Sequence, residues 1–143
     1  MSKIFFDTNI LLDILLPQRA NHSKAVKAFI MIANSYDTLS TSEDILTTVE
    51  YIASKNGIEC EKIYHFFKGL NEKFEIYNFQ TTLSESLEFY HKSCKENRTI
   101  DFEDVLQLFS AIKNGCDTFL TEDKEIKKLK LNIKVLSLED FHD

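Results

Sequence analysis

Short apolar runs with a strand-like pattern alternate along this chain with longer stretches whose apolar residues recur at helical spacing. The strand-like runs are rich in β-branched and aromatic residues, which favour extended backbone. They are Lys3–Phe6, Thr38–Ser40, Phe74–Phe79, Thr118–Leu120 and Lys134–Leu136. Strands that alternate with helices predict a mostly parallel sheet with helices on both faces.

The segments between these strands predict amphipathic helices. The clearest are His22–Ala33, Glu43–Lys55, Glu61–Leu70, Leu83–Lys95 and Phe102–Asn114. In the last of them Val105, Leu108, Phe109 and Ile112 follow the i, i+3, i+4, i+7 pattern, and Gly115 is placed to end the helix. No linker, repeat or low-complexity tract interrupts the pattern, so residues 1–143 are expected to form a single domain.

Length and charge restrict the classes of function. A chain of 143 residues buries roughly 70% of its unfolded surface, so it needs no disulfide or metal merely to fold. With 17 basic and 23 acidic residues its net charge is −6, which argues against a protein that holds nucleic acid by overall positive charge. A nuclease is still compatible with this charge, because an acidic site needs only bound cations and a local basic rim.

Cysteine usage and hydropathy bear on the compartment. The cysteines, Cys60, Cys94 and Cys116, show no Cys-x-x-Cys spacing, and the N-terminus has no signal-peptide pattern. No apolar stretch reaches the roughly 20 residues that span a bilayer. We therefore expect a cytoplasmic protein with reduced thiols and no membrane contact.

Asp7 and Asp123 follow predicted strands, and Asp101 and Asp104 begin a helix. Glu50 lies on the helix after the second strand, where Glu43 and Asp44 are competing candidates. The carboxyl ends of parallel strands share one edge of a sheet, where such folds bind ligands. Two carboxylates about 4 Å apart repel by roughly 4 kcal/mol at an effective dielectric constant near 20, so a cluster of them needs a cation or protonation. Oxygen ligands without a well-placed histidine or cysteine suit Mg²⁺ or Mn²⁺.

Four motifs in this order resemble the PIN domain ribonucleases, a family that includes the toxins of many toxin-antitoxin pairs. They are Asp7-Thr8-Asn9 with Leu11-Leu12-Asp13, an acid in the helix after the second strand, Asp101-Phe102-Glu103-Asp104-Val105-Leu106-Gln107, and Phe119-Leu120-Thr121-Glu122-Asp123. The resemblance covers nearly the whole chain. It implies a three-layer α/β/α sandwich around a central, mostly parallel sheet.

The resemblance also implies an activity and its residues. The activity is hydrolysis of RNA phosphodiester bonds with Mg²⁺ or Mn²⁺, and the family further implies an antitoxin protein as partner and a homodimer. The metal-binding acids would be Asp7, Glu50, Asp104 and Asp123, with Asp101 as an additional acid. Asn9 and Thr121 match positions that orient the carboxylates.

Basic residues near the predicted site are candidates for holding RNA phosphates. Lys124 follows Asp123, and Arg98 shortly precedes Asp101. The chain departs from the family at Glu122, where many members have arginine or asparagine. This extra acid makes the edge of the site more negative.

Each of these residues also has a purely structural interpretation. Asp7 can cap a helix, Asp101 can do so with Asp104 in the capping-box position, and Asp13 is predicted to be structural or exposed. An alternative function stays open: a PIN-like binding module with little hydrolysis that acts through a protein partner or RNA contact. Two other α/β classes are excluded by sequence, because a receiver domain needs an Asp after the third strand, and an Asp-x-Asp phosphatase needs Asp at position 9.

Overall fold

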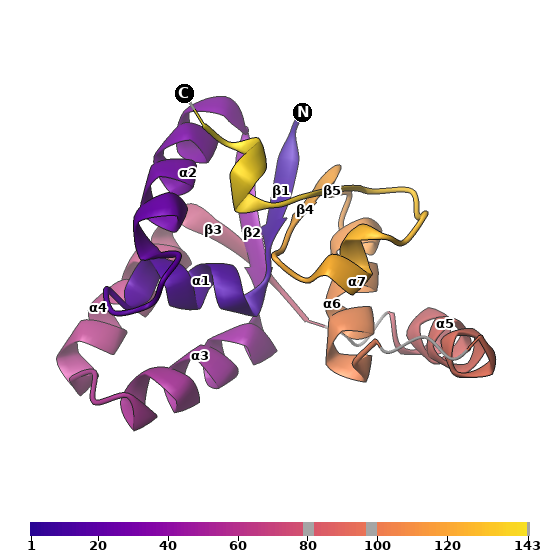
Figure 1. Cartoon of the computed structure of the whole chain (residues 1–143), viewed down its shortest axis with the longest axis horizontal. Helices are drawn as coiled ribbons and strands as arrows, with labels where there is room; N and C mark the ends of the chain where they lie inside the picture. The colour runs from indigo at the N-terminus through magenta and orange to yellow at the C-terminus, as the bar shows by residue number, and fades with distance from the viewer. Residues whose placement is uncertain (79–81, 97–99, 143) are drawn as a thin grey trace.

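A parallel sheet forms the centre of the molecule, in strand order β3-β2-β1-β4-β5 (Figure 1). The computed structural model describes residues 1–78, 82–96 and 100–142. Within these ranges the strands are β1 (Lys3–Phe6), β2 (Thr38–Ser42), β3 (Phe74–Tyr77), β4 (Thr118–Leu120) and β5 (Lys134–Leu136). The prediction of a mostly parallel sheet is confirmed. The third strand ends at Tyr77 rather than at Phe79, a residue outside the described ranges.

Helices cover both faces of this sheet, with α1 to α4 on one side and α5 to α7 on the other (Figure 1). In the described residues they are α1 (Thr8–Leu15), α2 (His22–Ser35), α3 (Glu43–Lys55), α4 (Cys60–Lys73), α5 (Leu83–Lys95), α6 (Phe102–Lys113) and α7 (Lys124–Lys127), followed by a short 3₁₀ helix at Leu138–Asp140. The expected three-layer α/β/α sandwich is confirmed. None of the helices in the described ranges is both long and apolar enough to span a bilayer.

The central strand β1 is apolar on both faces because both faces are covered. Phe5 stacks on Phe119 with ring centroids 5.2 Å apart, whereas Phe6 points to the opposite face and meets Phe29 and Phe74 at 6.0 and 5.1 Å. Phe5, Phe6 and Phe119 are fully buried. The backbone of a residue that directly follows β1 therefore lies in the interior of the protein.

The strand order reverses next to β1. From β1 the chain builds outward to β2 and β3 and then returns to place β4 on the other side of β1. In sheets of this kind the adjacent strand ends at such a reversal point leave a crevice, which is where ligands bind. Asp7 and the segment that follows β4 lie on the two sides of this point.

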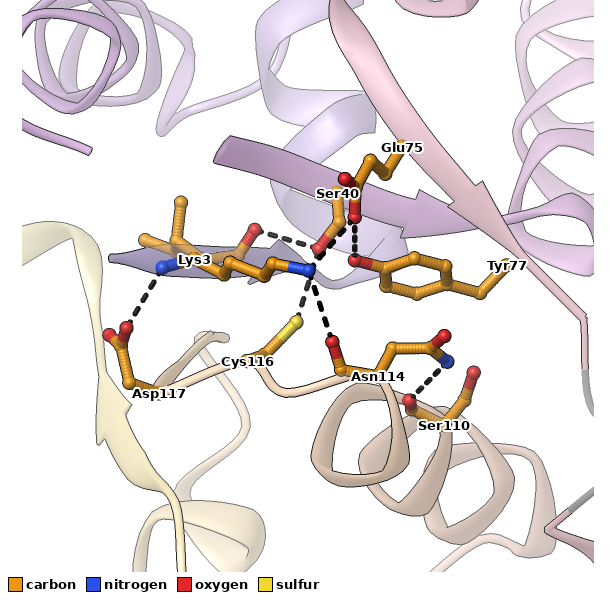
Figure 2. Close-up of polar contacts among 9 residues, drawn as sticks. Lys3, Ser40, Glu75, Tyr77, Ser110, Asn114, Cys116 and Asp117 are labelled. Carbon is orange, nitrogen blue, oxygen red and sulfur yellow. Dashed lines mark hydrogen bonds and ion pairs between the residues drawn. The ribbon is translucent and has the colours of Figure 1, made fainter. Parts of the chain in front are cut away.

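Polar residues fasten the C-terminal end of α6 to the sheet (Figure 2). The Lys3 ammonium lies 3.3 Å from a carboxylate oxygen of Glu75 and donates to the carbonyl of Asn114 at 3.3 Å. The Tyr77 hydroxyl donates to the same Glu75 oxygen at 2.6 Å, and this bond is the main reason that the pKa of Glu75 is lowered. With this end of α6 held at the start of β1, its first turn lies at the opposite edge, where β1 ends.

An ion pair between a buried carboxylate and a half-buried arginine fixes the segment after α1. Asp13, only 3% exposed, accepts a 2.7 Å bond from Nε of Arg19, whose Nη2 donates to the side chain of Asn9 at 3.1 Å. His22 contacts the Asp13 carbonyl through Nδ1 at 2.8 Å. Asp13 is therefore structural, as its sequence position predicts.

Replacing Arg19 with methionine should destabilise the protein, because it leaves the Asp13 carboxylate without its partner. A fully buried pair loses 3–5 kcal/mol when one member is removed; Arg19 is 31% exposed, so we expect about 1–3 kcal/mol. Urea denaturation measures the loss. Lys24→Met, which breaks an exposed pair with Glu139, is the control and should change stability by less than about 0.5 kcal/mol. Equal losses in the two variants would contradict this account.

Candidate metal-dependent nuclease site

Asp7 is the buried centre of the candidate site. It caps α1 at the end of β1 and is 5% exposed. Its Oδ1 accepts a 2.8 Å bond from the Thr8 amide, and its Oδ2 accepts a 2.7 Å bond from the Thr121 hydroxyl. Burial raises the pKa of Asp7; the two hydrogen bonds act against this rise, and the charges of Asp123 and Asp44 add to it. Asp7 thus serves as a helix cap and also faces other acids.

Thr121 links Asp7 to the acid that follows β4. Its hydroxyl is buried and donates to Asp7, and it also accepts a 3.0 Å bond from the amide of Asp123. Asp123 is exposed and caps α7, because its Oδ1 accepts the amide of Glu125 at 2.8 Å. One hydroxyl therefore bonds both to the side chain of Asp7 and to the backbone of Asp123.

The first turn of α6 brings a third acid to this edge. Asp104 is partly buried, and burial followed by the charges of Asp7, Asp123, Asp101 and Glu103 raises its pKa to about 7. Asp101 occupies the N-cap position and is exposed, but its side chain makes no capping hydrogen bond. The predicted capping box at Asp101 and Asp104 is therefore wrong, and Asp101 acts on its neighbours through its charge.

The acid that α3 contributes next to Asp7 is Asp44 rather than Glu50. Asp44 lies in the first turn of α3, directly after β2, and its charge contributes to the raised pKa of Asp7. Glu50 is exposed. Six helical residues correspond to about 9 Å along the axis and about 240° around it, so Glu50 faces away from the position of Asp44. The strand-end rule that selected Asp7 also points to a first-turn acid and could have selected Asp44.

Two further residues of α6, the acid Glu103 and the amide Gln107, lie next to these acids. The Gln107 amide nitrogen lies 3.0 Å from Oε1 of Glu103 and 3.4 Å from Oδ2 of Asp44. Glu103 is exposed as a residue, but partial burial of its carboxylate, followed by the charges of Asp44 and Asp7, raises its pKa. In the sequence Glu103 and Gln107 are only members of the motif 101–107, and position 107 lies on the side of the helix opposite the apolar stripe that begins at Val105.

Other predicted residues lie outside this group. Asn9 is exposed, and its side-chain oxygen accepts from Arg19 instead of orienting a carboxylate. Lys124 is exposed beside Asp123 and, together with Thr121 and Glu122, lines a cavity of about 340 Å³. Arg98 lies outside the described residues. Glu122 accepts the Leu138 amide at 3.4 Å, so it holds the C-terminal segment.

The donor chemistry of the site fits a hard divalent cation. The acids supply only carboxylate oxygens, and each oxygen of Asp7 accepts one hydrogen bond, which leaves lone pairs for an ion. Burial is the main cause of the raised pKa values at Asp7, Glu103 and Asp104, and the charges of neighbouring acids raise them further. Among the residues that the structure describes, no three acidic, histidine or cysteine side chains already converge on one ion position. Binding would therefore require rotation of the exposed carboxylates.

Comparison with known proteins identifies the class. The model of the PIN domain family matches residues 4–131, and the chain therefore belongs to this family. The resemblance predicted from the four motifs is confirmed. Membership implies use of a divalent metal ion, in agreement with the carboxylate site.

Individual relatives agree with this assignment. The chain is 35% identical over 140 residues to a protein of Aquifex aeolicus (strain VF5) named Ribonuclease VapC1, covering 97% of this chain and 92% of the relative. Among solved structures, VapBC2 of Rickettsia felis, bound to a DNA fragment from its promoter, superposes with a TM-score of 0.73 at 19% identity, covering 94% of this chain and 98% of that one. VapC20 of Mycobacterium tuberculosis, described as a Sarcin-Ricin loop cleaving toxin, gives 0.72 at 14% identity, with 92% and 98% covered. At such identities the two structures support the fold alone.

The raised pKa of Asp104 predicts a pH-dependent stability. The folded carboxyl, with a pKa of about 7 against an ordinary value of 3.8, keeps its proton between pH 4 and 7 while the unfolded chain loses it. Its contribution to stability is thus fully present below pH 4 and is lost as the pH rises to 7. In EDTA, Asp104→Asn should therefore be more stable than wild type at pH 8, by about 1–3 kcal/mol, and similar to it at pH 4. Urea melts at both pH values measure this difference.

The control for this experiment is Glu50→Gln, which removes an exposed acid from α3. It should change stability little at either pH. An Asp104→Asn effect that is the same at pH 4 and pH 8 would show that neither burial nor the neighbouring acids raise the pKa of Asp104.

Proposed function

We propose that this protein is an endoribonuclease that uses a divalent metal ion to hydrolyse RNA phosphodiester bonds. The observation that supports the proposal is that Asp7, Asp104 and Asp123 lie near the reversal point of a PIN domain sheet, close enough for their charges to interact. The relative named a ribonuclease, which matches nearly the full chain, supports the same activity. The oxygen-only ligands favour Mg²⁺ or Mn²⁺ over softer metals.

The acidic side chains and Thr121 would have different roles in cation binding. When bound, the cation supplies a water of lowered pKa as nucleophile and neutralises charge on the phosphate. Asp7, Asp104 and Asp123 would hold the cation, and Thr121 would keep Asp7 and Asp123 in place. Asp44 would take the part of the fourth acid that the resemblance assigned to Glu50, because it faces Asp7 and Glu50 does not.

Substrate phosphates would meet basic side chains beside Asp123. Lys124 lines the cavity next to Thr121, and Lys127 lines it as well while bonding to Ser137 and Asp140. Lys124 is thus the candidate for contact with an RNA phosphate. Arg98 stays a prediction from sequence.

The family relationship also supports a biological role as the toxin of a toxin-antitoxin pair. Several structural neighbours are toxin-antitoxin complexes, two of them described as bound to DNA. A partner could enter the acidic pocket with an arginine or lysine and balance the charge that the cation otherwise balances. A homodimer is part of the same proposal.

Removing a central acid should abolish cleavage while the fold is retained. We expect Asp7→Asn and Asp123→Asn to reduce RNA cleavage in Mn²⁺ or Mg²⁺ to background, because each removes a carboxylate of the cation site. Addition of Mn²⁺ should raise the melting temperature of wild type and leave that of Asp7→Asn unchanged, since a ligand stabilises only the state that binds it. Glu50→Gln, the matched control, should keep both cleavage and the Mn²⁺ shift.

Metal-dependent cleavage by a clean Asp7→Asn preparation would overturn the proposal. If wild type shows no Mn²⁺ shift, and Asp7→Asn is more stable than wild type in EDTA, the alternative of a binding module gains support.

The toxin role predicts inhibition of growth that a neighbouring gene relieves. Expression of wild type should stop growth of a bacterial host, whereas Asp7→Asn should not. Co-expression of a small reading frame from beside the gene should restore growth, and that product should co-purify with the Asp7→Asn chain. Growth inhibition that persists in Asp7→Asn would assign the toxicity to something other than cleavage.

A further inference from the structure

Gln107 is a fully buried amide that lies between two acids from different helices. It is 0% exposed and projects from the second turn of α6. Its nitrogen reaches Glu103 one turn earlier at 3.0 Å and Asp44 of α3 at 3.4 Å. The Asp44 carboxylate is held from its other oxygen by the Ser42 hydroxyl at 2.6 Å.

The orientation of the amide follows from electrostatics. An amide has a donor end and an acceptor end, and the acceptor end would repel two carboxylates, so the NH₂ group must face them. The Oε1 atom then points away and is buried without a hydrogen-bond partner among the described residues. A buried carbonyl without a partner costs stability. Gln107 is therefore a poor choice for a core residue and a good one for holding two carboxylates.

We propose that Gln107 is a positioning residue, whose amide holds Asp44 and Glu103 toward Asp7 so that they contribute to cation binding. The inference rests on the proposed metal-dependent function. A donor that bonds to a metal-binding or nearby carboxylate fixes its orientation, and loss of such a group typically weakens metal affinity by about 10–100-fold. Gln107 also connects α6 to α3, so it couples acids from the two sides of the sheet.

The test replaces Gln107 with methionine, which has a similar length and no hydrogen-bonding groups. In EDTA the melting temperature of Gln107→Met should stay within about 5 °C of wild type or rise, because the buried orphan carbonyl is removed. The Kd for Mn²⁺, measured from the free-ion electron paramagnetic resonance signal, should rise by about 10–100-fold. Ser110→Ala is the matched control, since Ser110 is buried on the same helix and bonds to the Asn78 carbonyl instead of to an acid. Its Mn²⁺ affinity should equal that of wild type.

A double-mutant cycle separates positioning from general packing. If Gln107 acts through Asp44, then Gln107→Met should cost much less Mn²⁺ affinity in an Asp44→Asn background than in wild type, by a factor of at least about 5. A packing defect would cost the same in both backgrounds.

The outcomes distinguish this inference from the proposed function. If wild type and Gln107→Met bind Mn²⁺ with the same Kd, the role of Gln107 is overturned and the proposed metal site is not. The same holds if the effects of the two substitutions in the double-mutant cycle are additive. Equal loss of affinity in Gln107→Met and Ser110→Ala also overturns it. Wild type that binds no Mn²⁺ overturns the metal-dependent function itself, and the inference with it.

Discussion

The burial of one carboxylate, that of Asp7, is the constraint on which the rest of the site depends. Asp7 follows β1, which is covered on both faces, so its side chain emerges from the interior rather than from the surface. A buried carboxylate needs hydrogen bonds, and it receives them from Thr8 and Thr121. Because the Thr121 hydroxyl also binds the Asp123 amide, satisfying the first acid places the second. The hydrogen bonds that compensate for the burial of Asp7 thus also position Asp123.

Repulsion between acids is tolerated here because the surrounding structure leaves them little freedom to separate. Asp44 and Asp104 each lie in the first turn of a helix whose body packs in the core through residues such as Ile45 and Leu108. Moving the backbone of either acid away would require moving its helix. In the folded state burial, together with the charges of the other acids, raises the pKa of Asp104 to about 7, a form of strain that proteins keep where function requires it.

Much of the fold could be predicted from sequence because periodicity reports burial directly. β1, β4 and β5 have their predicted bounds, and so do α3 and α5. The rule that parallel strands end at one edge selected Asp7 and Asp123 as candidate site residues. Whether Asp44 or Glu50 faces that edge depends on how α3 is rotated about its axis. Helical spacing in the sequence does not give this rotation.

Gln107 and Asn9 show a different limit of sequence reasoning. The apolar pattern of α6 places position 107 on the opposite side of the helix, and only the structure shows that Gln107 is buried there and meets Asp44 of another helix. Asn9 matched a family position, yet the ion pair of Asp13 with Arg19 turns it toward Arg19 instead. In both cases the outcome depends on a partner that is distant in sequence or specific to this chain.

The net charge of the chain has a local origin, and this resolves the apparent conflict between an acidic protein and an RNA substrate. The interacting acids of the site are Asp7, Asp44, Asp101, Glu103, Asp104 and Asp123. With these six set aside, acidic and basic residues are equal in number, so the formal charge of −6 equals the formal charge of these six acids. Outside the site the chain has no net charge to repel RNA. Divalent cations would neutralise the negative charge of the site acids, where the RNA phosphate must approach. Cation binding and substrate binding should therefore be coupled.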